Sequence, residues 1–173
     1  QTRYRVIAGT YSQPAYDSWR WRDDPMWLAG AEVSHSRAVG AGGVVLAAGH
    51  RRSTGYQEND DFRRYNAYAR IQAPLSARTT WSALASWSLD DHGTFLQWRS
   101  RTDPLRVPDS DASAATTSWK LAAHATLNHL YSAHTSLQLK GFYFLTDVDN
   151  SRAAGGFSTI GHKIGAETQV DHG

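Results

Sequence analysis

The fold class of this chain is decided by the stretch Thr79-Thr80-Trp81-Ser82-Ala83-Leu84-Ala85-Ser86-Trp87-Ser88-Leu89. Every second residue, starting from the first, belongs to the set Thr, Trp, Ala, Ala, Trp and Leu, and the residues between them are Thr, Ser, Leu, Ser and Ser. Successive side chains of a β-strand point to opposite faces, so this alternation gives one apolar face and one mostly polar face. We therefore predict a β-strand over residues 79–89.

Seven further segments read as strands, and three of them alternate as clearly as the first. The clear segments are Arg64–Ala73, Ser118–Asn128 and Leu137–Thr146. The weaker ones are Arg3–Thr10, Trp27–His35, Gly43–Arg52 and Ser158–Val170. Few stretches repeat with the 3.6-residue period of a helix. The sequence thus predicts an all-β chain, with residues 1–173 as a single antiparallel up-and-down meander of about eight strands. This meander would be part of a transmembrane β-barrel, or would close as one.

The connections between these strands alternate in length. The long ones cover residues 11–26, 53–61, 90–116 and 147–157, and the short ones cover residues 36–42, 74–78 and 130–134. Outer-membrane barrels have long extracellular loops and short periplasmic turns, whereas a soluble meander has no physical reason to separate them. The order of the connections therefore favours a barrel in the outer membrane of a Gram-negative bacterium, in contact with lipid.

Strand length and aromatic placement favour the same reading. Most segments run ten to thirteen residues, and a strand tilted by ~45° needs ~9–11 residues to cross the hydrocarbon core. On the apolar parity, Trp81 and Trp87 lie near opposite ends of one strand, and Trp119, Tyr65 and Tyr143 are expected at the long-loop ends of theirs. Aromatic girdles mark both interfaces of such barrels. The alternative is that these rings fill the core of a β-sandwich.

The composition excludes several classes of protein. No apolar run approaches the ~18 residues of a transmembrane helix, and a low mean hydropathy is typical of soluble proteins and of membrane barrels alike. The formal net charge is +2, and the basic residues are scattered, so we expect no nucleic-acid partner. Cysteine is absent, so there is neither a disulfide framework nor a thiolate metal site.

One part of the chain has a family resemblance. It is carried by Phe62–Arg70, by Trp81–Ser88, and by the run from Asp90 through Trp98 to the prolines at positions 104 and 108. Residues 42–147 in this pattern resemble the barrel of TonB-dependent outer-membrane receptors. The resemblance implies a barrel of about 22 strands with an N-terminal plug domain, which takes up scarce nutrients with energy delivered through TonB.

The chain departs from that family pattern in three ways. It has strands for about a third of such a barrel, it shows no plug domain or TonB-box segment, and it ends in Val170-Asp171-His172-Gly173 without a terminal aromatic residue. Its first residues, Gln1–Tyr4, also lack the features of a signal peptide. We therefore expect a fragment of a receptor. The alternatives are a complete eight-stranded outer-membrane barrel with a binding or structural role, and a soluble lipocalin-like barrel that binds a ligand inside.

Candidate ligand-binding residues lie on the polar parity of the strands and in the longest connection. The strand residues are Arg64, Arg70, Lys120, His124 and Lys140. In a barrel they form a basic wall facing the lumen, suited to an anionic or chelated ligand, or they are solvated or paired with a plug. The longest connection adds Trp98, Arg99 and Arg101, which suit polar ligands such as sugars or chelates. The alternative is an ordinary solvated loop.

Catalytic and metal-binding patterns are weak. Asp90-Asp91-His92 matches an acid–base pair, but nothing else in the sequence supports a nucleophile or an oxyanion site, so we expect no enzyme. The acidic runs 109–111 and 147–150 lack the ligand spacing of a calcium loop. His124, His129 and His134 are spaced by five, which alternates their faces on a strand, so they do not share a metal. We expect no cofactor.

Overall fold

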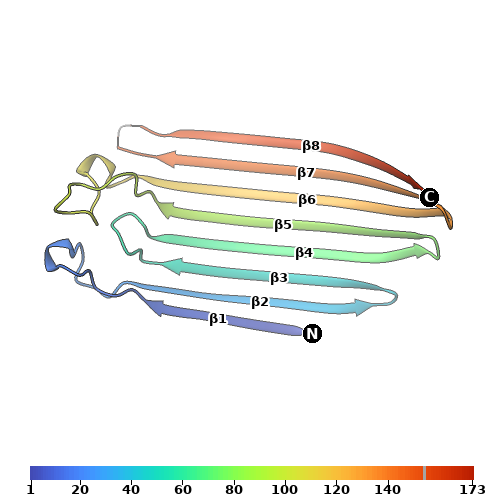
Figure 1. Cartoon of the computed structure of the whole chain (residues 1–173), viewed down its shortest axis with the longest axis horizontal. Helices are drawn as coiled ribbons and strands as arrows, with labels where there is room; N and C mark the ends of the chain where they lie inside the picture. The colour runs from blue at the N-terminus through green and yellow to red at the C-terminus, as the bar shows by residue number, and fades with distance from the viewer. Residues whose placement is uncertain (154) are drawn as a thin grey trace.

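The structure is a computed structural model that describes residues 1–153 and 155–173 and consists of one antiparallel sheet (Figure 1). Its strands are β1 (Thr2–Thr10), β2 (Trp27–Val39), β3 (Gly42–Ser53), β4 (Phe62–Ser76), β5 (Thr79–Gly93), β6 (Ala115–Ser132), β7 (Thr135–Ser151) and β8 (Phe157–His172). They pair in chain order, so the predicted all-β, up-and-down meander of eight strands is confirmed. Two short helical turns, η1 (Asp17–Trp19) and η2 (Asp109–Asp111), lie in the connections. No helix among the described residues is both long enough and apolar enough to span a membrane.

The strands extend beyond their predicted ends. The pairs Asp91↔Thr117 and Gly93↔Ala115 continue the ladder between β5 and β6 past the alternating segment. The sequence pattern stops at Leu89 because polar residues then follow on both faces, but backbone hydrogen bonding does not need an apolar face. The prediction that residues 90–93 belong to a loop is therefore wrong, and the longest connection covers residues 94–114.

The connections lie at opposite ends of the sheet according to their length. The long-loop end carries the connections 11–26, 54–61, 94–114 and 152–156, and the short-turn end carries 40–41, 77–78 and 133–134. Figure 1 shows the long connections gathered at the left and the short turns at the right. Gly40 has a φ of +57° in the first short turn, a backbone conformation that glycine adopts without a steric cost. The predicted alternation of long and short connections is confirmed.

The register separates the sheet into two chemically different faces. We call the apolar face the side with Trp81, Ala83, Ala85, Trp87 and Leu89 together with their cross-strand partners, and the polar face the opposite side. One row of the apolar face reads Leu46, Ala69, Ala85, Ala123, Tyr143 and Ile164. A row of the polar face reads Asn66, Ser88, Lys120, Thr146 and Gly161. The alternation within each strand therefore holds across the whole sheet.

Aromatic residues on the apolar face lie near the predicted ends of their strands, with two exceptions. Trp81 stands near the short-turn end of β5, but Trp87 lies one residue from the middle of that strand, so the prediction for it is wrong. Tyr65 and Trp119 stand near the long-loop ends of β4 and β6. Tyr143 does not, because it is the middle residue of β7, and the prediction for this side chain is wrong. The strand runs five residues beyond the alternating segment, which ends at Thr146, and this places Tyr143 away from the strand end. Its Oη lies 2.9 Å from Nδ1 of His162 on β8.

In the part of the chain that the structure describes, no hydrophobic core lies beneath the sheet. Within the described residues, the buried hydrophobic side chains are Met26, Leu105, Val107 and Ala114, and all four lie in the long connections. Large side chains of the apolar face are exposed to solvent: Leu46 is 50 % exposed and Ile164 is 84 % exposed. β1 and β8 pair only with β2 and β7 in the described chain, so the sheet is a single open layer with two free edges.

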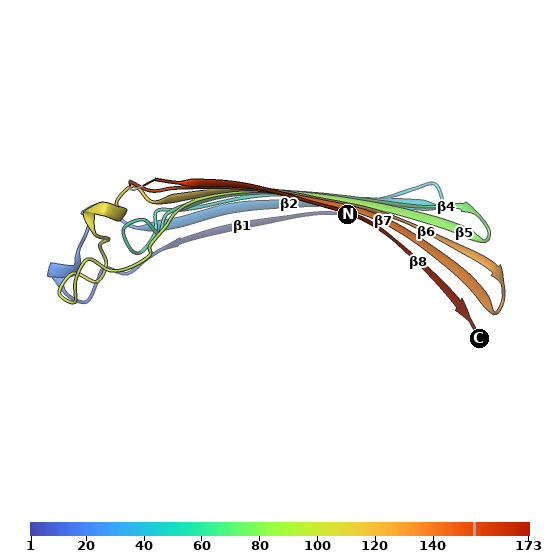
Figure 2. The same ribbon diagram turned by 90° about the horizontal axis from the view of Figure 1, so that it is seen from above.

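The polar face is the concave one. Figure 2 shows the connections 11–26 and 94–114 and the end of β8 bending toward the same side of the sheet. Ser53 and Asn150 belong to a polar-face row and are 2 % and 9 % exposed, because the long connections cover them. Tyr11, in the first long connection, places its Oη 2.8 Å from Oγ of Ser53. The long connections thus turn toward the polar face and cover its long-loop end.

The long connections 11–26, 54–61 and 94–114 pack together into one unit, which we call the loop cluster. Its buried side chains are Met26, Leu105, Val107 and Ala114. The Glu58 carboxylate accepts a hydrogen bond from the Val107 amide at 2.9 Å. The Asn59 side-chain amide donates to the Asp111 carbonyl at 2.7 Å. The backbone of Asn59 has a φ of 58°. These bonds satisfy backbone groups that the strands do not reach. The connections are therefore packed structure rather than solvated chain.

Gly165 on the polar face of β8 offers a first testable prediction. A Cβ at this position would meet the ring of Phe142, which lies across the glycine, whereas a Cβ at Gly161 would meet only the Thr146 carbonyl at 4.0 Å. Gly165→Val is therefore expected to lower the free energy of unfolding by about 1–3 kcal/mol. Gly161→Val, on the same face of the same strand, should change it by less than about 1 kcal/mol. Urea unfolding measures both, and equal values would contradict the placement of the Phe142 ring.

Candidate ligand-binding site

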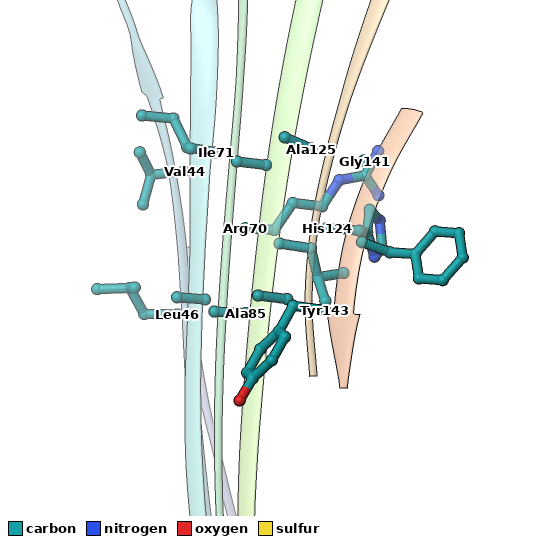
Figure 3. A pocket seen from close by; sticks show the side chains of 14 residues that line it. Val44, Leu46, Arg70, Ile71, Ala85, His124, Ala125, Gly141 and Tyr143 are labelled. Atoms are coloured by element: carbon teal, nitrogen blue, oxygen red, sulfur yellow. The ribbon is translucent and has the colours of Figure 1, made fainter. Parts of the chain in front are cut away.

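All five basic residues that the strand pattern singles out lie on the polar face. Arg70 and His124 share a row, in which Leu84 separates them. Figure 3 shows their side chains on one side of the sheet, with Val44, Leu46 and Ile71 on the other. Lys120 lies between Ser88 and Thr146 two rows away on the same face, with the row of Tyr68 and Phe144 in between. The structure therefore places these residues on one concave surface.

Ion pairs neutralise two of the five basic side chains. The Arg64 guanidinium lies 2.8 Å from the Asp90 carboxylate, and the Lys140 ammonium lies 3.1 Å from the Glu167 carboxylate. Each pair joins neighbouring strands across the polar face. Such partly exposed pairs contribute little to stability, but they remove the free charge of both partners. The basic wall predicted from sequence is thus smaller than the five residues suggest.

The remaining basic side chains have no carboxylate partner among the described residues. Arg70 donates to the Gln72 side-chain carbonyl at 3.2 Å, and Lys120 and His124 make no side-chain hydrogen bond in the described chain. Lys163 on β8 also has no carboxylate partner among the described residues. Its ammonium lies 5.6 Å from the centre of the Phe142 ring on the same face. The middle of the polar face therefore carries uncompensated positive charge.

Aromatic rings stand among these charges, and they are not among the residues predicted from the sequence to bind a ligand. Phe142 and Phe144 lie on the polar face of β7 with ring centres 5.7 Å apart. The Phe142 ring is also 5.7 Å from the Lys140 ammonium, within the range of a cation–π contact. Tyr68 lies in the same row as Phe144. The signal for these residues was available, because each interrupts the polar parity of its strand with a large ring.

A hollow of about 490 Å³ opens between these rings on the polar face, and we call it the polar-face hollow. Its polar-face lining consists of Asn66, Tyr68, Ser86, Ser88, Lys120, Ala122, Phe144 and Thr146. The aromatic rings come from β4 and β7, the small side chains of Ser86, Ser88 and Ala122 on β5 and β6 form its floor, and Lys120 also comes from β6. Lys120 is its one cationic lining residue, and no carboxylate lines it. This arrangement combines ring surfaces, hydroxyl groups and one positive charge.

A second hollow, of about 620 Å³, lies on the apolar face (Figure 3). Val44, Leu46 and Ile71 border it on one side and Tyr143 on the other. Its floor is made of alanines on the intervening strands. The depression exists because alanine rows stand between rows of larger side chains. It offers an apolar trough to whatever covers this face.

The loop residues singled out from sequence lie away from the polar-face hollow, and none of them lines it. Trp98 is 64 % exposed. Arg99 is paired with Asp109 at 3.0 Å, and its amide donates to the Arg106 carbonyl at 2.7 Å. Arg101 has no ionic partner among the described residues. The structure therefore does not bring the loop residues and the strand residues into one site.

The acidic and histidine motifs do not form a converging centre. Asp90 and His92 share the polar face of β5 with Nδ1 and Oδ1 3.5 Å apart, but Arg64 already pairs with that carboxylate. Asp91 points to the opposite face, where Oγ1 of Thr117 lies 3.3 Å from its Oδ1. Within residues 1–153 and 155–173, no three His, Cys, Asp or Glu side chains form a group that fits a metal ion.

Comparisons of the chain with protein-family models, curated proteins and solved structures gave no match. The two faces of the sheet and the polar-face hollow therefore carry the functional conclusion.

Proposed function

We propose that this chain forms part of the wall of a Gram-negative outer-membrane barrel that works as a receptor or transporter. Its apolar face meets lipid and its polar face lines the lumen. The observation that carries the proposal is the apolar face itself, which no other element of the described residues covers. Leu46 and Ile164 on it are 50 % and 84 % exposed. Soluble monomers rarely expose a continuous apolar surface of this kind.

The height of the apolar face fits a membrane. On β5 its uncharged stretch runs from Thr79 to Leu89, which is eleven residues, and Asp91 is the next residue on that face. On β7 the stretch from Thr135 to Leu145 is equally long, and Asp147 follows. At about 3.3 Å per residue and a tilt of about 45°, eleven residues span about 26 Å. Outer-membrane barrels carry an apolar band about 25 Å tall.

The curvature of the sheet supports this reading over the soluble lipocalin-like one. A ligand-binding soluble barrel places its apolar side chains on the concave inner face and its charges outside. Here the concave face carries Arg64, Lys120 and Lys140, and the long connections turn toward it at one end of the sheet. A membrane barrel has this arrangement, because its lumen is polar and its outer surface is apolar.

The uptake role rests on the polar face and on the resemblance to TonB-dependent receptors. A wall with free positive charge and a hollow suits the passage or capture of a polar solute better than a purely structural role. In this proposal a plug domain and TonB are partners of the full-length protein. The free edges of β1 and β8 also suit a larger barrel, because an unpaired edge seeks another strand. A closed eight-stranded barrel with a binding role is the second candidate, favoured by the number of strands.

Detergent dependence tests the membrane proposal. The purified chain is expected to fold in neutral detergent or lipid, with β-type circular dichroism and a shift in gel migration after boiling. In plain buffer it should aggregate, because its apolar face would meet water. A monodisperse, folded chain in plain buffer would overturn the proposal. The untreated and boiled samples of the same preparation serve as the internal control.

A further inference from the structure

We propose that the polar-face hollow binds an acidic sugar, meaning a hydroxylated ring that carries a carboxylate. The inference deepens the proposed function and rests on it in one respect, since the polar face must line a lumen open to water. The shape of the hollow, its hydrogen-bonding groups and its charge each point to this class of ligand.

The shape follows from the register. Tyr68 on β4 and Phe144 on β7 occupy one row, separated by Ser86 and Ala122. Three strand spacings of about 4.8 Å place their backbones about 14 Å apart. Two ring-bearing walls thus stand on either side of a floor of small residues, around about 490 Å³ of space. That volume falls within the range of small-ligand sites, and aromatic walls offer flat apolar surfaces to the C–H faces of a sugar ring.

The hydrogen-bonding groups of the hollow are unused. Among the described residues, the side chains of Asn66, Ser86, Ser88 and Thr146 make no hydrogen bond to any other side chain or to the backbone. Asn66, Ser88 and Thr146 lie in the row next to the aromatic walls. An amide and three hydroxyl groups are both donors and acceptors, as sugar hydroxyls require.

The charge of the hollow selects an anion. Lys120 stands in the same row as Ser88 and Thr146, is exposed, and has no carboxylate partner in the described chain. Lys163 on β8 lies opposite Phe144 in the ladder between β7 and β8. It therefore adds a second positive charge on the far side of the Phe144 ring from the hollow. Lys140 provides the contrast, because Glu167 holds its ammonium at 3.1 Å. A ligand carboxylate therefore finds its partner at Lys120.

Three probes separate the parts of this proposal. The full chain, folded in neutral detergent, is titrated with glucuronate, glucose and benzoate by calorimetry or ligand-observed NMR. Glucuronate is expected to bind at least about fivefold more tightly than either other probe, because a charge-assisted hydrogen bond is stronger than a neutral one. Glucose lacks the carboxylate, and benzoate lacks the hydroxyls. Equal binding of the three probes, or tightest binding of benzoate, would overturn the assignment.

Two matched variants locate the site. Lys120→Gln should weaken glucuronate binding about five- to tenfold and leave glucose binding unchanged. Lys140→Gln removes the same charge from the same face and should change glucuronate binding less than about twofold. Phe144→Leu should weaken glucuronate and glucose alike. An equal loss in the two lysine variants would show a general electrostatic effect and would overturn the site. Heat-modifiable migration of each variant verifies that it is folded.

The two proposals fail separately. A chain that folds only in detergent but shows no preference for glucuronate overturns the sugar site and leaves the membrane wall intact. A chain that folds in plain buffer overturns the membrane wall, and the same titrations then report on the hollow directly.

Discussion

Replacement of Ala83 with arginine is expected to lower the free energy of unfolding in lipid by about 2–4 kcal/mol, or to block insertion altogether. Ala83 lies on the apolar face near the middle of the uncharged stretch of β5, opposite Ile71 on β4 and Ala125 on β6. At this level of the proposed membrane, an arginine side chain meets hydrocarbon instead of water. The cost arises because the charged group loses its hydration without gaining a partner.

The neighbouring residue supplies the control for this substitution. Ser82 precedes Ala83 on the same strand but belongs to the polar face, in a row with Gln72, Thr126 and Lys140. Ser82→Arg should therefore change the free energy of unfolding by less than about 1 kcal/mol. Urea titration in lipid vesicles, followed by tryptophan emission, measures both variants. An equal loss in the two would contradict the assignment of the apolar face to lipid.

Replacement of Val107 with aspartate is expected to open the loop cluster. The Val107 side chain is 1 % exposed, and its amide already donates to the Glu58 carboxylate at 2.9 Å. A second carboxylate there would be buried without a partner and would repel the first. Burial of an unpaired charge costs several kcal/mol, which is a large share of the stabilisation that four buried side chains provide. Limited proteolysis and hydrogen exchange of residues 94–114 should both speed up strongly.

Leu96 offers the matched position for that test. It lies in the same connection, but its side chain is 46 % exposed, so Leu96→Asp places the new charge in contact with water. This variant should leave cleavage and exchange near the wild-type rates. The strands should remain protected in both variants, because their ladder does not depend on the cluster. If Val107→Asp left residues 94–114 as protected as before, the packing of the cluster would be refuted.

The loop cluster changes how the lumen side of the sheet is reached. Ser53 and Asn150, at the long-loop end of the polar face, are buried beneath the long connections. The polar-face hollow lies further along the strands and remains open. In the proposed barrel, a solute arriving from the long-loop end would pass this packed cap before it meets Lys120. Opening the cap with Val107→Asp should therefore not weaken glucuronate binding.

The sequence alone determined the strands, their two faces and the order of the connections. Each of these is a local property: a period of two in residues 79–89 fixes both the strand and the side to which Trp81 and Ser82 point. Local patterns do not predict strand ends where the ladder continues without an apolar alternation, as at residues 90–93. For the same reason they do not predict how far Tyr143 lies from the end of β7.

Only the tertiary structure decided which polar-face residues act together. Arg64 and Lys140 each form an ion pair with a carboxylate, whereas Lys120 has no such partner among the described residues. This difference depends on which residues lie opposite each other on neighbouring strands. The hollow between Tyr68 and Phe144 depends on the register of four strands at once. The loop cluster joins segments that lie tens of residues apart in the chain. Register and packing are non-local, because a shift of one residue in a single strand exchanges its two faces, and no pattern within one strand records its position relative to the next.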